Sequence, residues 1–352
     1  MVSNYLNKLF YFVILFFIAL IFNILTSSNS NAACAKDANG AILVNTSAGA
    51  IFADESTPKT FDQDACQEEP DEYKLTFYKI SLCPEAEDPY TNGTSPDYTG
   101  CVDILDEEKE VVIKPGVDTD LLTGGLEIPL GTYSIIAVIV DNHVKIKTKQ
   151  KYVLTNGNPA TLKGSSGGSG GTWCWSKSAV TVYSGDGDLP SDTDYETAHG
   201  GVDVVVSAHS GNARLDCGDE PDDSDVEFAT EIIDNINDPT HDGGGNYDFG
   251  ASLDYSDNSD VTGLSGSLLG ANLLQNDNST IASNEDNARR IAGFFKYPNH
   301  PIRIVEETNS FKLELSTSES VSIDMEVNSS VIWGVKMGGD PFSIKVVTTE
   351  GS

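Results

Sequence analysis

The sequence predicts a mostly β protein of two antiparallel, sandwich-like domains, with one or two short helices in the second. Three observations lead to this prediction. Short runs of alternating apolar and polar residues recur along the chain, separated by turn-forming residues. A Gly/Ser-rich stretch divides these runs into two groups. All six cysteines lie beyond residue 33, which is typical of an exported, disulfide-linked protein.

The Gly/Ser-rich stretch, residues 163–172, has the composition of a flexible linker. It is predicted to separate an N-terminal β-sandwich-like domain, residues 33–162, from a C-terminal acidic β-rich domain, residues 173–352. A chain of 352 residues fits two domains of ordinary size, because one domain typically takes about 100–200 residues.

In the N-terminal domain, strands are expected over residues 73–77, 102–105, 111–113 and 126–129. The continuous apolar run 135–140 is predicted to be a central strand that is buried on both faces. Asp141 and Asn142 then favour a tight turn, because both residue types tolerate positive φ. A returning strand is expected over 144–154.

The segment Ile128-Pro-Leu-Gly-Thr-Tyr133, which leads into the apolar run, has the order Pro-x-Gly-x-Tyr. It resembles the strand entry of transthyretin-like and related immunoglobulin-like sandwich modules. The resemblance covers about a dozen residues. It implies a sandwich fold of that type and carries no functional residues.

In the C-terminal domain, strands are expected over 179–183 and 202–207, and then in a closing series. Alternation of apolar residues places that series at 302–305, 311–315, 321–327, 331–335 and 342–346. Apolar residues at helical spacing predict a helix over 224–237, and a second helix is expected over 284–295. No repeat of fixed period is evident, which argues against solenoids and propellers.

The first 32 residues are predicted to be a secretory signal peptide. Lys8 precedes an apolar run over 9–22, and the small residues Ser30 and Ala32 flank the expected cleavage site. An uncleaved anchor is the alternative, although Asn23 interrupts the run and a spanning helix needs about 20 apolar residues. We therefore expect a secreted or cell-surface protein with no span after cleavage, with the periplasm as an alternative location.

An even number of cysteines in an exported chain indicates disulfides. Pairing of nearest neighbours is predicted, because it keeps each bridge inside one domain. The expected bridges are Cys34–Cys66, Cys83–Cys101 and Cys174–Cys217. No Cys/His spacing suggests zinc or redox chemistry.

The chain carries 54 acidic and 21 basic residues, a net charge of −33. Such a charge argues against nucleic-acid and anionic-membrane partners, because phosphates are bound by Lys and Arg. Carboxylates are densest over 178–286, where Arg214 is the single basic residue. This density suggests Ca²⁺, and the solvated surface of an acidic protein is the alternative. No EF-hand or nonapeptide motif is present. The tentative calcium ligands are Asp186, Asp188, Asp192, Asp194, Asp254, Asp257 and Asp260.

Two groups of residues suggest an interaction surface. Four lysines at period two, Lys145, Lys147, Lys149 and Lys151, would project from one face of the strand 144–154. They would either protect a sheet edge or contact the acidic region of another copy. Trp173 and Trp175 would lie on one side of a strand, either as a sugar-stacking platform or packed on a disulfide.

We predict no catalytic residues, because the five histidines and the serines form no recognised catalytic spacing. The function expected by elimination is a non-catalytic structural or adhesive protein of a surface layer or fibre. Its partners would be other copies or cell-surface polymers. A calcium-dependent carbohydrate-binding module is the alternative, and a secreted hydrolase is the third reading.

Overall fold

The computed structural model describes residues 33–45, 51–63, 65–90, 93–117, 119, 121–122, 127–158, 160–164, 170–182, 214–236, 250–328, 331–339 and 342–350. Residues 33–352 form one compact unit. The predicted leader, the predicted strand 202–207 and the tentative ligands Asp186, Asp188, Asp192 and Asp194 lie outside the described residues. Within the described part, no helix has the length and apolarity needed to cross a bilayer.

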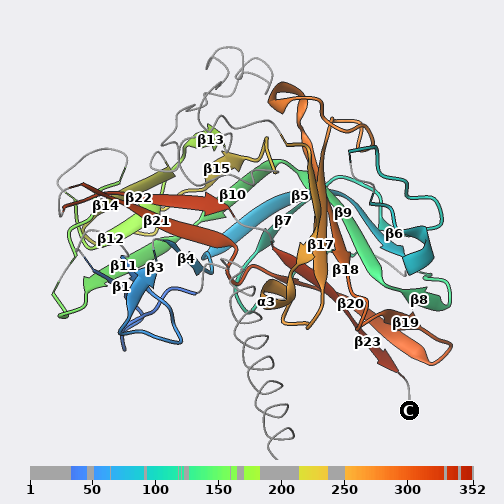
Figure 1. Cartoon of the computed structure of the whole chain (residues 1–352), viewed down its shortest axis with the longest axis horizontal. Coiled ribbons are helices and arrows are strands. Elements are labelled where there is room, and N and C mark those ends of the chain that lie inside the picture. Colours follow the sequence, from blue (N-terminus) through green and yellow to red (C-terminus); the bar gives the residue numbers. More distant parts are fainter. Residues whose placement is uncertain are drawn as a thin grey trace, which may run out of the picture. The chain divides into compact units, whose positions relative to one another are not determined.

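The mostly β fold is confirmed, and its largest element is a ten-stranded sheet (Figure 1). The twelve-residue strand β5 lies at its centre because its side chains alternate between half-buried and buried over most of its length. The strand order is β13 (Val180–Val182), β15 (Ala229–Ile232), β10 (His143–Lys147), β5 (Glu72–Cys83), β9 (Ile135–Asp141), β18 (Arg290–Lys296), β17 (Leu268–Leu274) and β16 (Ser252–Asp257), and β6 (Val102–Leu105) and β7 (Lys109–Ile113) also pair with β5.

The predicted central strand is confirmed as β9, whose first six residues are all buried between β5 and β18. The predicted tight turn after it is wrong. β10 does not return along β9; both strands pair with β5, β9 with residues 77–83 and β10 with residues 72–74. The chain therefore runs on through Asn142. On the side away from β5, β9 pairs with β18, whereas β10 pairs with β15.

After β10 the chain passes into a second, six-stranded sheet. The predicted single strand 144–154 is in fact two strands, which belong to different sheets and meet at the buried residue Thr148. Both have neighbours on each side, so neither is an edge strand. The order in this sheet is β14 (Leu215–Gly218), β12 (Trp173–Ser176), β11 (Lys149–Leu154), β1 (Ile42–Val44), β2 (Phe52–Ala53) and β3 (Phe61–Gln63), with β1 and β11 parallel.

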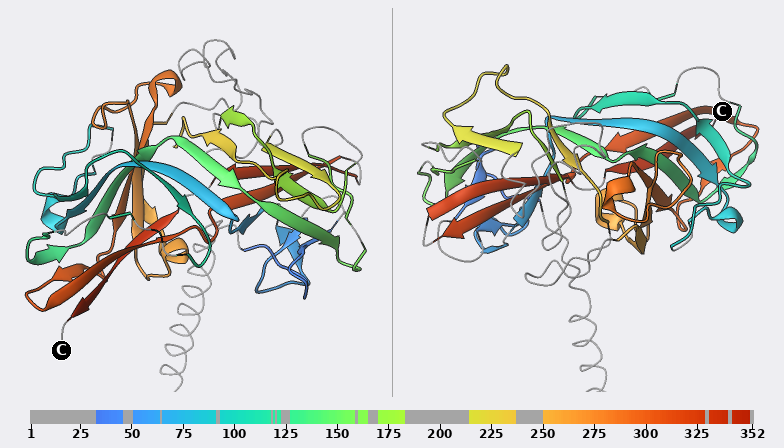
Figure 2. Two further views of the ribbon diagram at one scale, coloured as in Figure 1. Left: turned by 180° about the vertical axis from the view of Figure 1, so that it is seen from behind. Right: turned by 90° about the horizontal axis from the view of Figure 1, so that it is seen from above.

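The predicted C-terminal strands are confirmed and form three smaller sheets. Their alternation is visible in β20, where Leu313 is buried and Lys312 is exposed. Figure 2 shows β20 and β23 side by side, with the chain ending just beyond β23. The sheets are β19 (Ile302–Ile304) with β8 (Gly131–Tyr133), β20 (Thr308–Ser316) with β23 (Ser343–Glu350), and β22 (Val331–Gly339) with β21 (Val321–Asn328) and β4 (Ala65–Glu68).

The two predicted helices are wrong. Residues 224–236 contain the strand β15, which is held between β10 and β13. Residues 284–295 contain a single 3₁₀ turn, η3 (Glu285–Asn287), followed by β18. In both segments sheet pairing overrides the helical spacing of the apolar residues. The described part of 126–129 forms no strand. In the part of the chain that the structure describes, the remaining helical elements are α3 (Ser259–Thr262) and η1 (Glu85–Glu87).

The Gly/Ser-rich stretch does not mark a break in the strand network. β11 pairs with β12 across it, β9 pairs with β18, and β4 pairs with β21. Its ends are tied by two backbone hydrogen bonds between Leu162 and Gly171, of 2.8 and 2.9 Å. Gly171 is required there, because a Cβ at this position would lie 1.8 Å from the carbonyl oxygen of Gly218.

The predicted disulfide pairing is confirmed for all three bridges. Cys34–Cys66 joins the segment before β1 to β4, and therefore links two sheets. Cys83–Cys101 closes the loop that contains η1. Cys174–Cys217 joins directly opposed residues of β12 and β14.

Candidate functional site

The four predicted interaction lysines are divided between β10 and β11, and three of them, Lys145, Lys149 and Lys151, contact acidic or aromatic side chains. Lys145 lies opposite Lys74, and Glu110 bridges the two ammonium groups at 3.7 and 3.4 Å. Lys149 pairs with Asp223 at 3.1 Å. This pairing reduces the positive charge of the row, because Glu110 and Asp223 each lie within ion-pair distance of a lysine.

Trp173 and Trp175 are both half-buried on β12. The ammonium groups of Lys149 and Lys151 lie 5.9 and 5.5 Å from the Trp173 ring centroid, within cation–π range. Trp175 contacts Gly218 of the neighbouring strand β14, where an added Cβ would lie 3.1 Å from the ring. The structure therefore brings Trp173 together with two of the predicted lysines. Lys147 lies on β10 beside Lys145.

The described calcium candidates lie at the end of β16 and on α3. Asp254 accepts a hydrogen bond from the Tyr90 hydroxyl at 2.7 Å. Asp257 accepts from the backbone N–H of Ser259 at 2.8 Å. Hydrogen bonding to the Ser259 side chain and to this N–H lowers the pKa of the Asp257 carboxyl. Asp260 lies in the first turn of α3. Among the described residues, no three His, Cys, Asp or Glu side chains are grouped in a way that would hold a metal ion.

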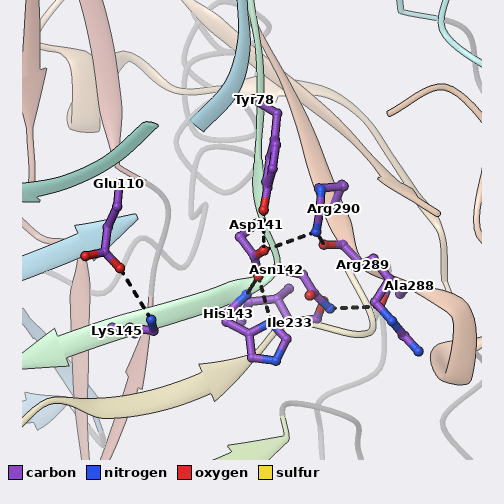
Figure 3. Close-up of polar contacts among 10 residues, drawn as sticks. All are labelled: Tyr78, Glu110, Asp141, Asn142, His143, Lys145, Ile233, Ala288, Arg289 and Arg290. Atoms are coloured by element: carbon purple, nitrogen blue, oxygen red, sulfur yellow. Dashed lines mark hydrogen bonds and ion pairs between the residues drawn. The ribbon is translucent and has the colours of Figure 1, made fainter. Parts of the chain in front are cut away.

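A polar cluster that the sequence did not predict surrounds Asp141, at the end of β9. Figure 3 shows Tyr78, His143 and Arg290 converging on its carboxylate from β5, β10 and β18. The His143 ring Nδ1 lies 2.7 Å from Oδ1. The Tyr78 hydroxyl donates to Oδ2 at 3.0 Å, and Arg290 Nη1 donates to the same oxygen at 3.1 Å.

Charge and burial set the protonation of this cluster. Burial opposes ionisation of Asp141, but the hydrogen bonds from His143 and the nearby Arg290 charge outweigh it and lower the pKa of the carboxyl. Burial and the Asp141 charge raise the pKa of Tyr78 to about 12. Arg290 also lies over the Tyr78 ring, with its Cζ 3.8 Å from the centroid. The aspartate is therefore ionised and the phenol protonated at neutral pH.

An Asp–His pair can orient an imidazole for acid–base chemistry. Here, however, both carboxylate oxygens are engaged by neighbouring side chains. The four side chains line neither the groove nor the hollow described below. The arrangement thus serves best as a clamp that joins β5, β9, β10 and β18 at the point where β9 passes into β10.

The pair β20–β23 presents a different feature, the edge of β20 that faces away from β23. Among the described strands, β20 pairs only with β23. A groove of about 250 Å³ lies between residues 312–317 and the segment after β7, residues 114–117 and 119. Val117 in that segment is 58 % exposed.

The side chains of β20 determine which of its faces packs on the core. Leu313 is buried, and Phe311 and Leu315 pack against the core on the same face. Lys312 and Glu314 lie on the opposite face, where Lys345 of β23 pairs with Glu314 at 3.2 Å. The core-facing residues hold the register, so the polar face keeps a fixed order of charges.

Comparison of this chain with protein-family models, with curated protein sequences and with solved structures finds no match.

Proposed function

We propose that this protein acts outside the cytosol as a non-catalytic structural or adhesive subunit, and that copies of it associate through the edge of β20. The export signal predicted at the N-terminus and the three disulfides support an extracellular location. The order of charges on β20 is the observation that carries the assembly proposal.

That order is self-complementary about Leu313. In an antiparallel pairing of two β20 strands centred on Leu313, Lys312 of one copy lies opposite Glu314 of the other, and the reverse holds by symmetry. Ser310 then lies opposite Ser316. Cross-strand pairs of opposite charge stabilise a sheet by about 0.2–1 kcal/mol each. A two-fold contact of this kind is also the commonest symmetry of protein dimers.

An immunoglobulin- or transthyretin-like architecture for the predicted domains is part of the same proposal. It is supported by Tyr133, whose hydroxyl donates to the carbonyl oxygen of Pro129 at 2.9 Å. A tyrosine that bonds back to the backbone a few residues upstream is a recurrent feature of immunoglobulin-like sandwiches.

Charge exchange tests the assembly. We expect the oxidised protein to self-associate in sedimentation experiments. Lys312→Glu or Glu314→Lys should raise the dimer Kd by about tenfold, because each change makes two attractive pairs repulsive. The double variant Lys312→Glu/Glu314→Lys restores opposite charges and should recover association.

Lys59→Glu is the matched control, because Lys59 is exposed, lies between β2 and β3 of the six-stranded sheet and does not line the groove beside β20. This variant should associate like the unmodified protein. Monomer at every concentration, or equal association of the single and double charge variants, would contradict the proposal.

A further inference from the structure

An apolar hollow of about 230 Å³ lies against the inner face of the ten-stranded sheet. Alternate residues of β5, β9, β17 and β18 line it, and Phe342, at the end opposite the sheet, packs on Tyr73, Phe77 and Phe295 with ring centroids 5.9–6.5 Å away. Ile236 and Leu253 at its margin are half-buried, whereas Leu75 and Val138 are buried. The hollow therefore has an apolar floor and a partly open margin.

The strand register explains why space is left at this place. Val138, Gly293, Ala271 and Leu253 are directly opposed across β9, β18, β17 and β16, so they form one row on the inner face. The two middle positions of this row carry almost no side chain. The rows on either side are filled by larger residues, Phe295 with Leu269 and Ile291 with Val140. Gly293 and Ala271 thus leave a gap in an otherwise filled surface.

The lining determines the class of ligand. Among the described residues that surround the hollow, Asn235 is the only side chain with an amide, Tyr73 adds one hydroxyl, and none is charged. No lining side chain is a cation that could pair with an anion, and the whole chain has a net charge of −33. Anionic ligands are therefore disfavoured. For scale, an apolar cavity of about 150 Å³ in another protein binds benzene.

We propose that this hollow is a binding site for a neutral hydrocarbon group of about the size of naphthalene. The group would be either a free small molecule or the end of an alkyl chain. An empty void of this size lacks van der Waals contacts along its walls, and an apolar occupant supplies them. The site is independent of the proposed association through β20, because no residue is shared between the two.

The test is titration of the full disulfide-bonded protein with naphthalene, followed by fluorescence. Saturable binding is expected for the unmodified protein. Ala271→Phe places a large side chain in the gap and should weaken naphthalene binding at least tenfold. The far-UV circular dichroism spectrum should stay that of the unmodified protein. Gly293→Ala adds only a methyl, 3.3 Å from Val138 Cγ2, and should weaken binding less. This smaller change keeps the test valid if Ala271→Phe fails to fold.

Leu130→Phe is the control for added aromatic surface, because Leu130 is 60 % exposed and does not line the hollow. It should bind like the unmodified protein. Competition by 1-octanol would assign the site to alkyl chains, and failure to compete would assign it to ring compounds; both support the site. The proposal would be overturned if the unmodified protein showed no saturable naphthalene binding, or if Ala271→Phe and Gly293→Ala both bound naphthalene as the unmodified protein does.

Discussion

The side-chain amide of Asn142 donates a hydrogen bond to the carbonyl oxygen of Ala288 at 3.1 Å, although 146 positions of the chain separate them. The same amide donates to the carbonyl oxygen of Ile233, also at 3.1 Å. Asn142 is fully buried and lies where β9 passes into β10 and the outer neighbour changes from β18 to β15. One side chain thus bonds to backbone carbonyls of two segments that lie on either side of the point where the neighbouring strand changes.

Replacing this residue should destabilise the protein strongly. Asn142→Leu removes both donors and leaves two buried carbonyl oxygens without these partners. The Ile233 oxygen then loses this donor, whereas the Ala288 oxygen keeps its hydrogen bond from Arg289 Nη1 at 2.7 Å. An unsatisfied buried group costs about 1–3 kcal/mol, so we expect a loss of about 1–3 kcal/mol in the free energy of unfolding, measured with urea. Asn39→Leu changes an exposed asparagine and should alter stability far less. Equal effects of the two substitutions would contradict this role for Asn142.

Asp141 should make stability depend on acid pH. Its folded-state pKa lies below the ordinary value of 3.8, so its contribution is present above about pH 4 and is lost as the pH falls through the folded pKa. Asp141→Asn should therefore cost about 1.5–3 kcal/mol at pH 7 and progressively less below pH 4.

Urea unfolding of both proteins between pH 7 and pH 3 measures this difference. Asp106→Asn is the control, because Asp106 is an exposed carboxylate that pairs with Lys79. It should change stability by less than about 1 kcal/mol at every pH. A constant difference between the unmodified protein and Asp141→Asn across this range would rule out ionisation of Asp141 as the cause.

A buried ion pair joins Arg214 to Glu231 at 2.6 Å, and both side chains are at least 96 % buried. Arg214 also donates to Thr181 and to the carbonyl oxygen of Met337, so from its place just before β14 it connects residues of two further sheets. Arg214→Met leaves the Glu231 carboxylate buried without its cation and should cost about 3–5 kcal/mol.

The double variant Arg214→Met/Glu231→Leu removes both charges and should recover most of that loss. Breaking the exposed pair Lys114–Glu72 by Lys114→Met should cost about 0–1 kcal/mol. Thermal or urea unfolding of the four proteins provides the comparison. A double variant no more stable than Arg214→Met would show that the unpaired charge is not what destabilises the single variant.

Local sequence patterns were sufficient for several elements of the fold. β9 was predictable because six consecutive apolar residues require burial on both faces. The C-terminal strands were predictable because apolar and polar residues alternate along them, which places one face of each strand against the core. The disulfide pairing was predictable from the spacing of the cysteines along the chain and from the oxidising compartment expected for an exported protein. These features depend on residues close together in the chain.

The rest depended on pairing between distant segments. Nothing local shows that the chain changes sheets at Thr148, so the four lysines were placed on one strand. Apolar residues of β15 and β18 occur at helical spacing, and only their neighbours in the sheet select a strand. Asp141 and His143 are two positions apart, whereas Tyr78 and Arg290 are 63 and 149 positions from Asp141. The clamp was therefore not visible in the sequence.

The extracellular location is checked most sharply by mapping the disulfides of protein recovered from outside the cell. We expect no free thiols, an N-terminus beyond the apolar leader, and the bridges Cys34–Cys66, Cys83–Cys101 and Cys174–Cys217. Six reactive thiols in the native protein, or a cytosolic product that keeps its leader, would contradict it.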